Sequence, residues 1–206
     1  MNWDPLFKQH GRYFHNPHAN MNAFVALLKK EKAQRVLDLG CGSGRHTVFL
    51  ASKGFHVTAL DNSDEGIQLT RQWLKKRGER ARLVKGNAFA RLPFPSHYFD
   101  AVVSVQVLHH GKIIEIRRAI QEVHRVLRKK GWAFITLTKI RHRFKGSKVK
   151  ELAPRTYWSL NGYEKGAIHY LFTKEKIREE FNDFDVGRIW LDTDKYYCFF
   201  ARKNQD

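Results

Sequence analysis

Three glycines stand at alternate positions, Gly40, Gly42 and Gly44, directly after a short apolar run. A turn so rich in glycine lets a ligand approach the main chain closely. A dinucleotide fingerprint needs its third glycine five residues after the first, where this chain has Arg45, and the Gly-Lys-Ser/Thr ending of a P-loop is missing as well. Asp38 precedes the turn and would repel a pyrophosphate but attract an ammonium or sulfonium group. The turn therefore predicts a site for a cationic nucleoside without phosphate.

Two adjacent histidines, His109 and His110, follow another apolar run. An unperturbed imidazole titrates near neutrality, so either one could be the general base that takes a proton from a reacting group. Adjacent side chains rarely face one site together, and we therefore expect at most one of the pair to act. The alternative is that His110 caps or packs the helix that follows.

Other chemistry-bearing residues are few. Cys41 lies within the glycine turn, where we expect a small packing residue and not a nucleophile. No His/Cys cluster and no carboxylate-rich cluster has the spacing of metal ligands. The sequence therefore predicts no metal.

Alternating strand and helix patterns provide the elements that must position these residues. Strand-like runs span 35–39, 56–61, 81–86, 98–108 and 131–140, and helical patterns span 20–32, 64–78 and 112–128, with a further helix from Arg45. The run 98–108 is too continuously apolar for an edge strand, so we expect a central strand that is buried on both faces. Strands separated by helices predict an α/β fold with a doubly wound, mostly parallel sheet and helices on both faces.

The last third of the chain departs from this alternation. Residues 173–181 are helical in pattern, and 183–192 and 195–203 are typical of an antiparallel strand pair. The segment 141–170 lacks clear periodicity and is rich in basic and aromatic residues, as in a lid, a binding segment or a mobile loop. No linker or internal repeat divides the chain, so we expect one domain over 1–206.

The pattern D-x-G-x-G-x-G, from Asp38 to Gly44, resembles the first motif of class I S-adenosylmethionine-dependent methyltransferases. Further matches follow in the family's order after the second, third and fourth strands, and the resemblance covers about residues 30–202. It implies a seven-stranded sheet whose last strand is antiparallel. It also implies S-adenosylmethionine as the cofactor, S-adenosylhomocysteine as the product, and methyl transfer as the activity.

The resemblance also implies roles for single residues. Asp61, at the end of the second strand, would accept both ribose hydroxyls. Asn87 stands where the family usually has Asp, and its amide oxygen would accept the adenine amino group without a charge. The residues expected to bind the cofactor are Asp38, Gly40, Cys41, Gly42, Gly44, Asp61, Asn62, Asn87, Ala88, Phe89, Val105, Gln106 and Tyr13.

Two segments are candidates to close over the site. The aromatic-rich segment 1–20 would fold over the cofactor, with Tyr13 as the closing residue, or it would only anchor the N-terminus to the core. The second lid would come from 141–170. The residues expected to contact the acceptor are Phe14, Tyr157, Trp158, His169 and Tyr170.

Charge bears on the acceptor. Lys and Arg number 38 against 20 Asp and Glu, a formal net charge of +18 that attracts polyanions. The stretch 141–150 is basic and has aromatic residues near it, but the basic residues are spread over several helices and no RRM or KH motif is present. We therefore predict a small-molecule acceptor, with RNA (tRNA) as the alternative. A catalytically inactive partner protein is a second alternative, which the intact Asp38 and Asp61 disfavour.

The expected compartment is the cytoplasm, because the chain has two cysteines, no apolar leader and no apolar run long enough to cross a bilayer. No membrane contact is expected. Nothing in the sequence indicates an oligomeric state.

Overall fold

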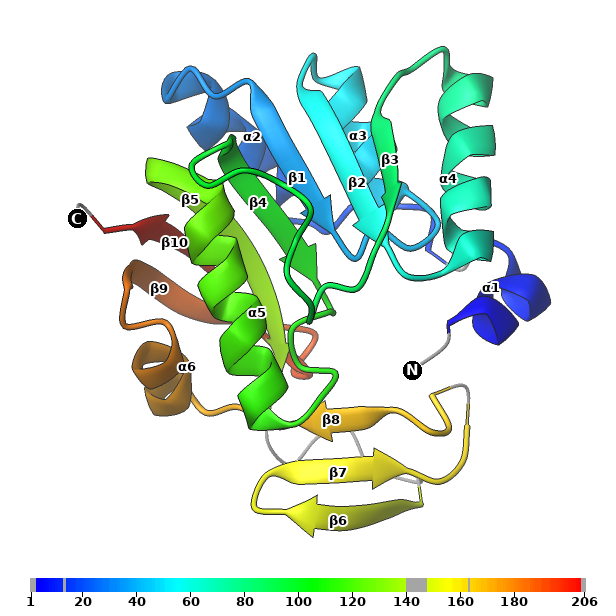
Figure 1. Cartoon of the computed structure of the whole chain (residues 1–206), viewed down its shortest axis with the longest axis vertical. Helices are drawn as coiled ribbons and strands as arrows, with labels where there is room; N and C mark the ends of the chain where they lie inside the picture. Colours follow the sequence, from blue (N-terminus) through cyan, green and yellow to red (C-terminus); the bar gives the residue numbers. More distant parts are fainter. Residues whose placement is uncertain (1–2, 13, 140–147, 163, 205–206) are drawn as a thin grey trace.

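The computed structural model describes residues 3–12, 14–139, 148–162 and 164–204. Its main sheet has seven strands in the order β3-β2-β1-β4-β5-β10-β9, and β10 runs antiparallel to both of its neighbours (Figure 1). The strands are β1 (Arg35–Leu39), β2 (His56–Asp61), β3 (Arg82–Lys85), β4 (Phe99–Val105), β5 (Leu127–Thr138), β9 (Phe184–Asp192) and β10 (Tyr196–Lys203). The fold class implied by the sequence and its resemblance is confirmed.

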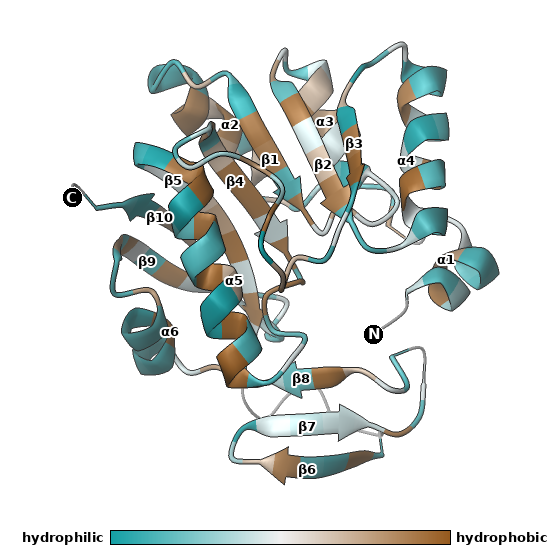
Figure 2. Cartoon of the chain, viewed as in Figure 1, coloured by the Kyte–Doolittle hydropathy of each residue, from teal (hydrophilic) through white to brown (hydrophobic). Residues whose placement is uncertain are grey.

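Helices cover both faces of this sheet. They are α2 (Met21–Lys30), α3 (Arg45–Ser52), α4 (Asp64–Arg77), α5 (Ile113–Val126) and α6 (Lys174–Glu180). One core cluster joins the apolar faces of α5 and α6 to the sheet, and a second joins α2, α3 and the end of α4 to the other face. Figure 2 shows the apolar residues on the strands and the inward helix faces, with polar residues outside. Burial on both sides explains why β4 lacks polar alternation.

Local signals set the ends of the helices. Ser63 caps α4, since its hydroxyl accepts a hydrogen bond from Gly66 N, and Gly78 ends the helix in the left-handed region. The order of the strands then brings the carboxyl ends of β1, β2, β3 and β4 to one edge, as the parallel pairing requires. Loops at this edge are where open α/β sheets bind ligands.

Two elements were not expected from the sequence. Residues 4–10 form a short helix, α1 (Asp4–His10), whose seven residues are too few to show periodicity. The segment 141–170 was expected to be irregular, and this is wrong for its described part. Here β6 (Val149–Ala153), β7 (Thr156–Ser159) and β8 (Ile168–Tyr170) form an antiparallel sheet below the carboxyl edge (Figure 1). These strands are short, and β6 is exposed on both faces, so no apolar alternation marks them.

The basic stretch at 141–147 lies outside the described residues. Among the described helices, none combines the length and apolarity needed to cross a membrane. The assignment of 1–206 to one domain stays a prediction.

Candidate active site

A cavity of about 470 Å³ opens at the carboxyl edge of the parallel strands. Its walls come from the glycine turn, from the ends of β2, β3 and β4, from α1, and from the turn between β9 and β10. The volume lies within the range of small-molecule sites.

The glycine turn is held against β2, since Gly40 N and Cys41 N both donate to Leu60 O, at 2.7 and 3.0 Å. Gly40 has φ +75°, and a Cβ there would lie 2.4 Å from a methyl carbon of Val107. Gly44 has φ +91°, and its Cβ would lie 2.7 Å from Thr70 side-chain atoms. Both positions therefore need glycine for backbone and packing reasons, whatever ligand the turn meets.

Asp61 lies at the end of β2 on the cavity wall. Its Oδ2 accepts from Gly42 N at 2.8 Å and its Oδ1 from Ser63 N at 2.9 Å. Burial raises the pKa of this carboxyl, and the two backbone hydrogen bonds oppose that rise. The main chain thus fixes the carboxylate, while each oxygen keeps lone-pair capacity for a hydroxyl donor.

Asp38 is not among the cavity-lining residues, in contrast to the role expected for it. It is 1% exposed, and Thr47 Oγ1 donates to its Oδ2 at 2.6 Å. Burial raises the pKa of Asp38 to about 6. Asp38 does not line the cavity because this hydrogen bond turns its carboxyl toward α3.

Arg45 takes the place on the wall that Asp38 was expected to have. Burial lowers the pKa of its guanidinium, and the carboxylates of Asp38 and Asp192 oppose that shift. The guanidinium lies 4.4 Å from the ring centroid of Phe14, which also lines the cavity. A partly buried guanidinium is suited to an anionic group of a ligand.

The remaining residues expected at the cofactor form a mixed polar and apolar part of the wall. They are Asn62, Asn87, Ala88, Phe89, Val105 and Gln106. Asn87 Oδ1 accepts from Phe89 N at 2.9 Å, which leaves this oxygen capacity for one further donor. Every residue of this group that the sequence placed at the site lies on the wall.

The N-terminal segment covers the glycine turn. Asp4 accepts from Ser63 Oγ and, at 3.1 Å, from Glu65 N, so α1 is tied to the start of α4. Phe7 packs over Gly42, since a Cβ there would meet its ring at 3.1 Å. Trp3, Leu6 and Phe7 line the cavity, which makes α1 a cover for it. Tyr13, the residue expected to close this lid, lies outside the described residues.

The two histidine rings lie close together, with 4.3 Å between their centroids, but only His110 lines the cavity. His110 lines the cavity and meets the Trp3 ring edge to face, with 4.9 Å between the ring centroids. His109 is fully buried and is not part of the wall. Cys41 lines the cavity and packs with Ala59 and Ile67, and burial raises the pKa of its thiol well above the usual value.

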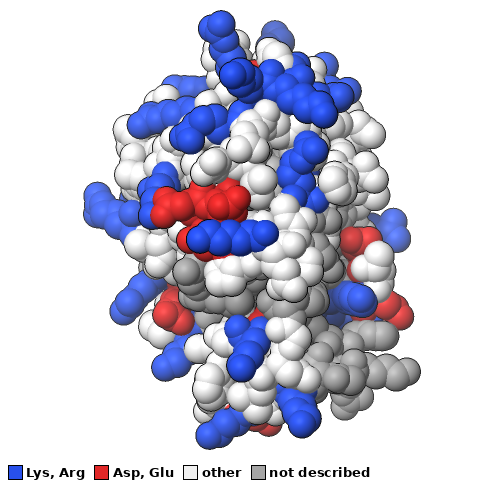
Figure 3. All heavy atoms as spheres, turned by 90° about the vertical axis from the view of Figure 1, so that its right-hand side faces the viewer, with Lys and Arg blue, Asp and Glu red and all other residues white. Residues whose placement is uncertain are grey.

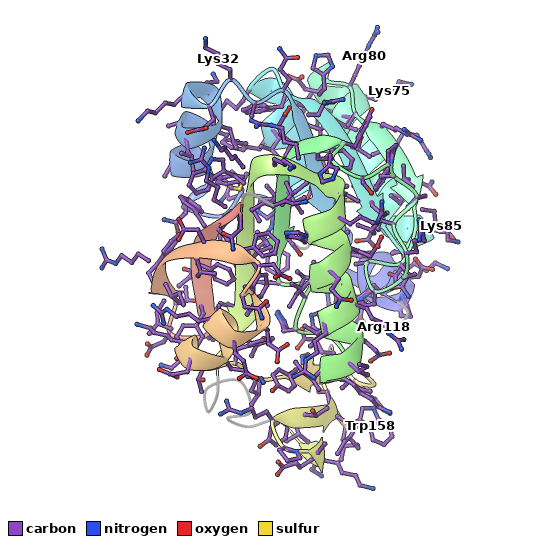
Figure 4. All side chains as sticks on the ribbon, turned by 60° about the vertical axis from the view of Figure 1, so that its left-hand side comes forward. Lys32, Lys75, Arg80, Lys85, Arg118 and Trp158 are labelled. Carbon is purple, nitrogen blue, oxygen red and sulfur yellow. The ribbon has the colours of Figure 1, made fainter. Side chains whose placement is uncertain are left out.

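Four residues expected at the acceptor do not line the cavity: Tyr157, Trp158, His169 and Tyr170. The second sheet determines where they point. Trp158 lies at the outer end of the molecule (Figure 4), Tyr170 packs edge to face with Phe172 in the core, and His169 is fully buried. The expectation that they contact the acceptor directly is therefore not supported by their positions.

Other lining residues were missed in the sequence. Glu164 comes from the turn before β8, and Asp192, Thr193, Lys195 and Tyr196 come from the β9–β10 turn. Nothing local distinguishes them, because they reach the cavity only through the position of β9 and β10 beside β5. The antiparallel strand pair expected at 183–192 and 195–203 was the one signal that could have indicated the residues of the β9–β10 turn, since that turn lies at the carboxyl edge of the sheet.

Comparisons with known proteins match the chain to methyltransferases. A family profile described as "Methyltransferase domain" matches residues 36–131. The chain is 25% identical over 134 residues to a ubiquinone biosynthesis O-methyltransferase of Nitrosomonas europaea, covering 65% of this chain and 56% of that protein. It is 31% identical over 139 residues to a tRNA (carboxymethyluridine(34)-5-O)-methyltransferase of Xenopus tropicalis. This match covers 67% of this chain and 20% of that protein.

Solved structures are similar over nearly the whole chain. A protein of Pyrococcus horikoshii OT3 superposes with a TM-score of 0.77 at 23% identity, covering 97% of this chain and 99% of that one. A 1,6-didemethyltoxoflavin-N1-methyltransferase of Burkholderia thailandensis, solved with S-adenosylhomocysteine, superposes with a TM-score of 0.69 at 21% identity. The superposition covers 91% of this chain and 79% of that one. These likenesses show the fold, and the chain spans about half the length, or less, of the curated relatives it matches.

Proposed function

The chain belongs to the class I S-adenosylmethionine-dependent methyltransferase family, and we propose that it transfers the methyl group of this cofactor to a small-molecule acceptor by in-line displacement. The observation that carries the proposal is the position of Asp61, a carboxylate fixed by two backbone hydrogen bonds at the end of β2, on the wall of a cavity of suitable size.

The chemistry of the wall fits the three parts of such a cofactor. Asp61 accepts the ribose hydroxyls, and Asn87, Ala88 and Phe89 receive the adenine. Arg45 binds the carboxylate of the methionine end, and Asp192, on the same wall, attracts its ammonium group. Asp38 does not contact the cofactor but acts as a positioning residue, because its charge attracts the guanidinium of Arg45.

The bound cofactor supplies a sulfonium carbon that is already activated for displacement. The protein then has to align the acceptor and, where the acceptor carries a proton, remove it. His110 and Glu164 both lie on the wall and are the candidate bases. His109 is expected to have no such role, because it does not reach the cavity. The cover formed by α1 shields part of the site from water.

The size of the cavity, about 470 Å³, favours a small acceptor. Trp3 and Phe7 from the N-terminal segment and Tyr196 from β10 line it, so an acceptor must share this space with the cofactor. Relatives named for small-molecule acceptors and one named for tRNA both match this chain, so the names alone do not choose between the two classes.

An RNA acceptor is the second candidate, and a basic surface favours it. Lys32, Lys75 and Arg80 lie together at the end of the molecule remote from Trp158 (Figure 4), and Figure 3 shows basic side chains concentrated at that same end. Lys32 and Arg80 precede β1 and β3, so this surface lies at the amino edge of the sheet, opposite the cavity. An RNA bound there alone would not deliver a base to the site, and we therefore place this candidate second.

The cofactor part of the proposal is tested by calorimetric titration with S-adenosylhomocysteine. Asp61→Ala removes a carboxylate that makes charged hydrogen bonds, and we expect it to weaken binding by about 10- to 100-fold. Asp64→Ala is the matched control, because Asp64 is an exposed carboxylate three residues along the same loop and helix. Circular dichroism establishes that both variants are folded. Equal affinity in the wild type and Asp61→Ala would contradict the role of Asp61.

The acceptor part needs a transfer assay. Labelled-methyl transfer to a metabolite extract, but not to bulk tRNA, is the expected result. Transfer to tRNA, with binding that falls steeply as salt rises, would establish the RNA alternative instead. Cofactor binding without transfer to either pool would favour the inactive partner protein.

A further inference from the structure

Three imidazoles meet beside the cavity. His109 and His110 come from the connection between β4 and α5, and His169 comes from β8. One ring nitrogen of each lies within 4.8 Å of the corresponding nitrogens of the other two. The ring centroids are 4.3 Å apart for His109 and His110, 4.8 Å for His110 and His169, and 6.2 Å for His109 and His169.

The backbone holds this cluster together. Tyr170 N donates to His109 O at 2.8 Å, which joins β8 to the loop that carries the histidine pair. The pairing of Tyr157 with His169 fixes β8 in turn to β7. The three histidines are thus brought together by main-chain hydrogen bonds on both sides of His169, and two of them are fully buried.

A carboxylate completes the group of ligand atoms. Glu164 Oε2 lies 3.7 Å from His169 Nε2, and Glu164 and His110 both line the cavity. Imidazole nitrogens with a carboxylate oxygen are the ligand types that Zn²⁺ and other divalent transition metals take in open, catalytic sites. A tetrahedral zinc ion holds its ligand atoms about 3.4 Å apart, so the cluster has to contract by about 1.4 Å, within the reach of side-chain rotation.

We propose that His109, His110 and His169 bind a divalent transition metal, with Glu164 at the fourth position or in contact with it. Because His110 and Glu164 face the cavity, the metal lies where an oxygen, nitrogen or sulfur atom of an acceptor can reach it. The spacing of these residues in the sequence predicted no metal, since His169 and Glu164 are far from the histidine pair in the chain. The metal site rests on different observations from the cofactor proposal. With a metal bound, the lone pairs of the ligating His110 and Glu164 are occupied, so the base role given to these two residues above applies to the metal-free protein.

A second group of potential ligands, His18, Asp192 and Cys198, does not support the same inference. His18 Nδ1 accepts from Asn20 N at 3.2 Å, and its Nε2 lies 3.0 Å from Asp192 Oδ2. An imidazole that accepts at Nδ1 and donates a proton at Nε2 has no lone pair left for a metal. The hydrogen bonds of His18 therefore account for the close approach of these three side chains without a metal.

The test uses the full chain without a histidine tag, treated with a chelator and then dialysed. Titration with Zn²⁺ should give one site per chain with a Kd below about 1 µM, and Co²⁺ should give the visible absorption of a tetrahedral complex. His110→Ala should weaken Zn²⁺ binding by at least about 100-fold, more than the loss of an outer partner. His56→Ala, at the exposed start of β2, is the control and should bind as the wild type does.

His110 carries the test because its side chain reaches the cavity surface, so we expect its removal to leave the fold intact, which circular dichroism establishes. His169→Ala is the supporting variant, used if circular dichroism shows it to be folded. Absence of stoichiometric binding to the wild type would overturn the proposal, and so would equal binding by His110→Ala and His56→Ala. Neither result bears on S-adenosylhomocysteine binding, which stands or falls with Asp61.

Discussion

Replacing Asp38 by asparagine tests how the fold tolerates a carboxyl group behind the cavity wall. Asp38 is 1% exposed, and burial is the main reason that its pKa rises from 3.8 to about 6. The hydrogen bond from Thr47 and the charge of Arg45 oppose this rise. A rise of roughly two pKa units means that the fold favours the protonated over the ionised carboxyl by about 3 kcal/mol.

The sign of the pH dependence of stability follows from which state, folded or unfolded, binds the Asp38 proton more tightly. The unfolded chain releases the Asp38 proton near pH 3.8 and the folded chain near pH 6, so the folded state binds more protons between these values. The contribution of this group to the free energy of unfolding therefore falls as the pH rises from about 4 to about 6, and is level above that range. In Asp38→Asn this dependence is absent.

Urea denaturation of both proteins, followed by tryptophan fluorescence between about pH 4 and pH 7, measures the difference. We expect Asp38→Asn to gain about 2 kcal/mol relative to the wild type over this rise in pH, because the carboxyl of the unfolded chain is already more than half ionised at pH 4. The titrations of all other groups cancel in the difference between the two proteins. A difference that does not change with pH would refute the reasoning.

Asp100→Asn is the matched control with the opposite sign. Partial burial opposes the shift, but hydrogen bonds from Arg35 N and Gln34 N and the pairing with Arg128 lower the pKa of Asp100. Its ionised form is therefore stabilised by folding, and that stability is lost as the pH falls. Asp100→Asn should accordingly lose stability relative to the wild type as the pH rises.

Two further predictions concern the cover and the turn. Asp4→Ala removes the acceptor that ties α1 to Ser63 and Glu65, worth about 1 kcal/mol, so S-adenosylhomocysteine should dissociate about 5-fold faster in stopped-flow displacement. The exposed Lys8→Ala should leave the rate unchanged, and equal rates for both variants would count against α1 as a cover. Gly44→Ala should lose about 2 kcal/mol or more in urea denaturation, from its positive φ and the contact with Thr70. Gly54→Ala has a similar φ and open space around its Cβ, so it should lose less, and equal losses would show that the contact with Thr70 does not matter.

Local sequence together with the family resemblance predicted the part of the site that lies at the ends of parallel strands. Asp61 ends β2, Asn87 and Gln106 follow β3 and β4 within two residues, and all three line the cavity. Parallel strands joined by helices must place their carboxyl ends at one edge, so the order of the motifs along the chain already implied that they meet. The glycine positions were equally visible, because a positive φ leaves a residue-type signal.

Side-chain direction was outside the reach of the pattern. Asp38 stands where a ligand contact was expected, but the hydroxyl of Thr47 on α3 turns it away, and Arg45 lines the cavity instead. Similarly, Trp158 and Tyr170 have the residue types of an acceptor site, but the register of β7 and β8 places one at the surface and the other in the core. Residue type specifies what a side chain can bind, while packing decides what it meets.

The sequence by itself determined the α/β fold, the glycine turn and the carboxylate at the end of β2, because each depends on residues close together in the chain. Only the tertiary structure decided what faces these residues. The packing of α1 on α4, the return of β9 and β10 beside β5, and the hydrogen bond from Tyr170 to His109 all join segments distant in sequence. Such contacts leave no local periodicity or spacing, since they form only when the separate elements have packed.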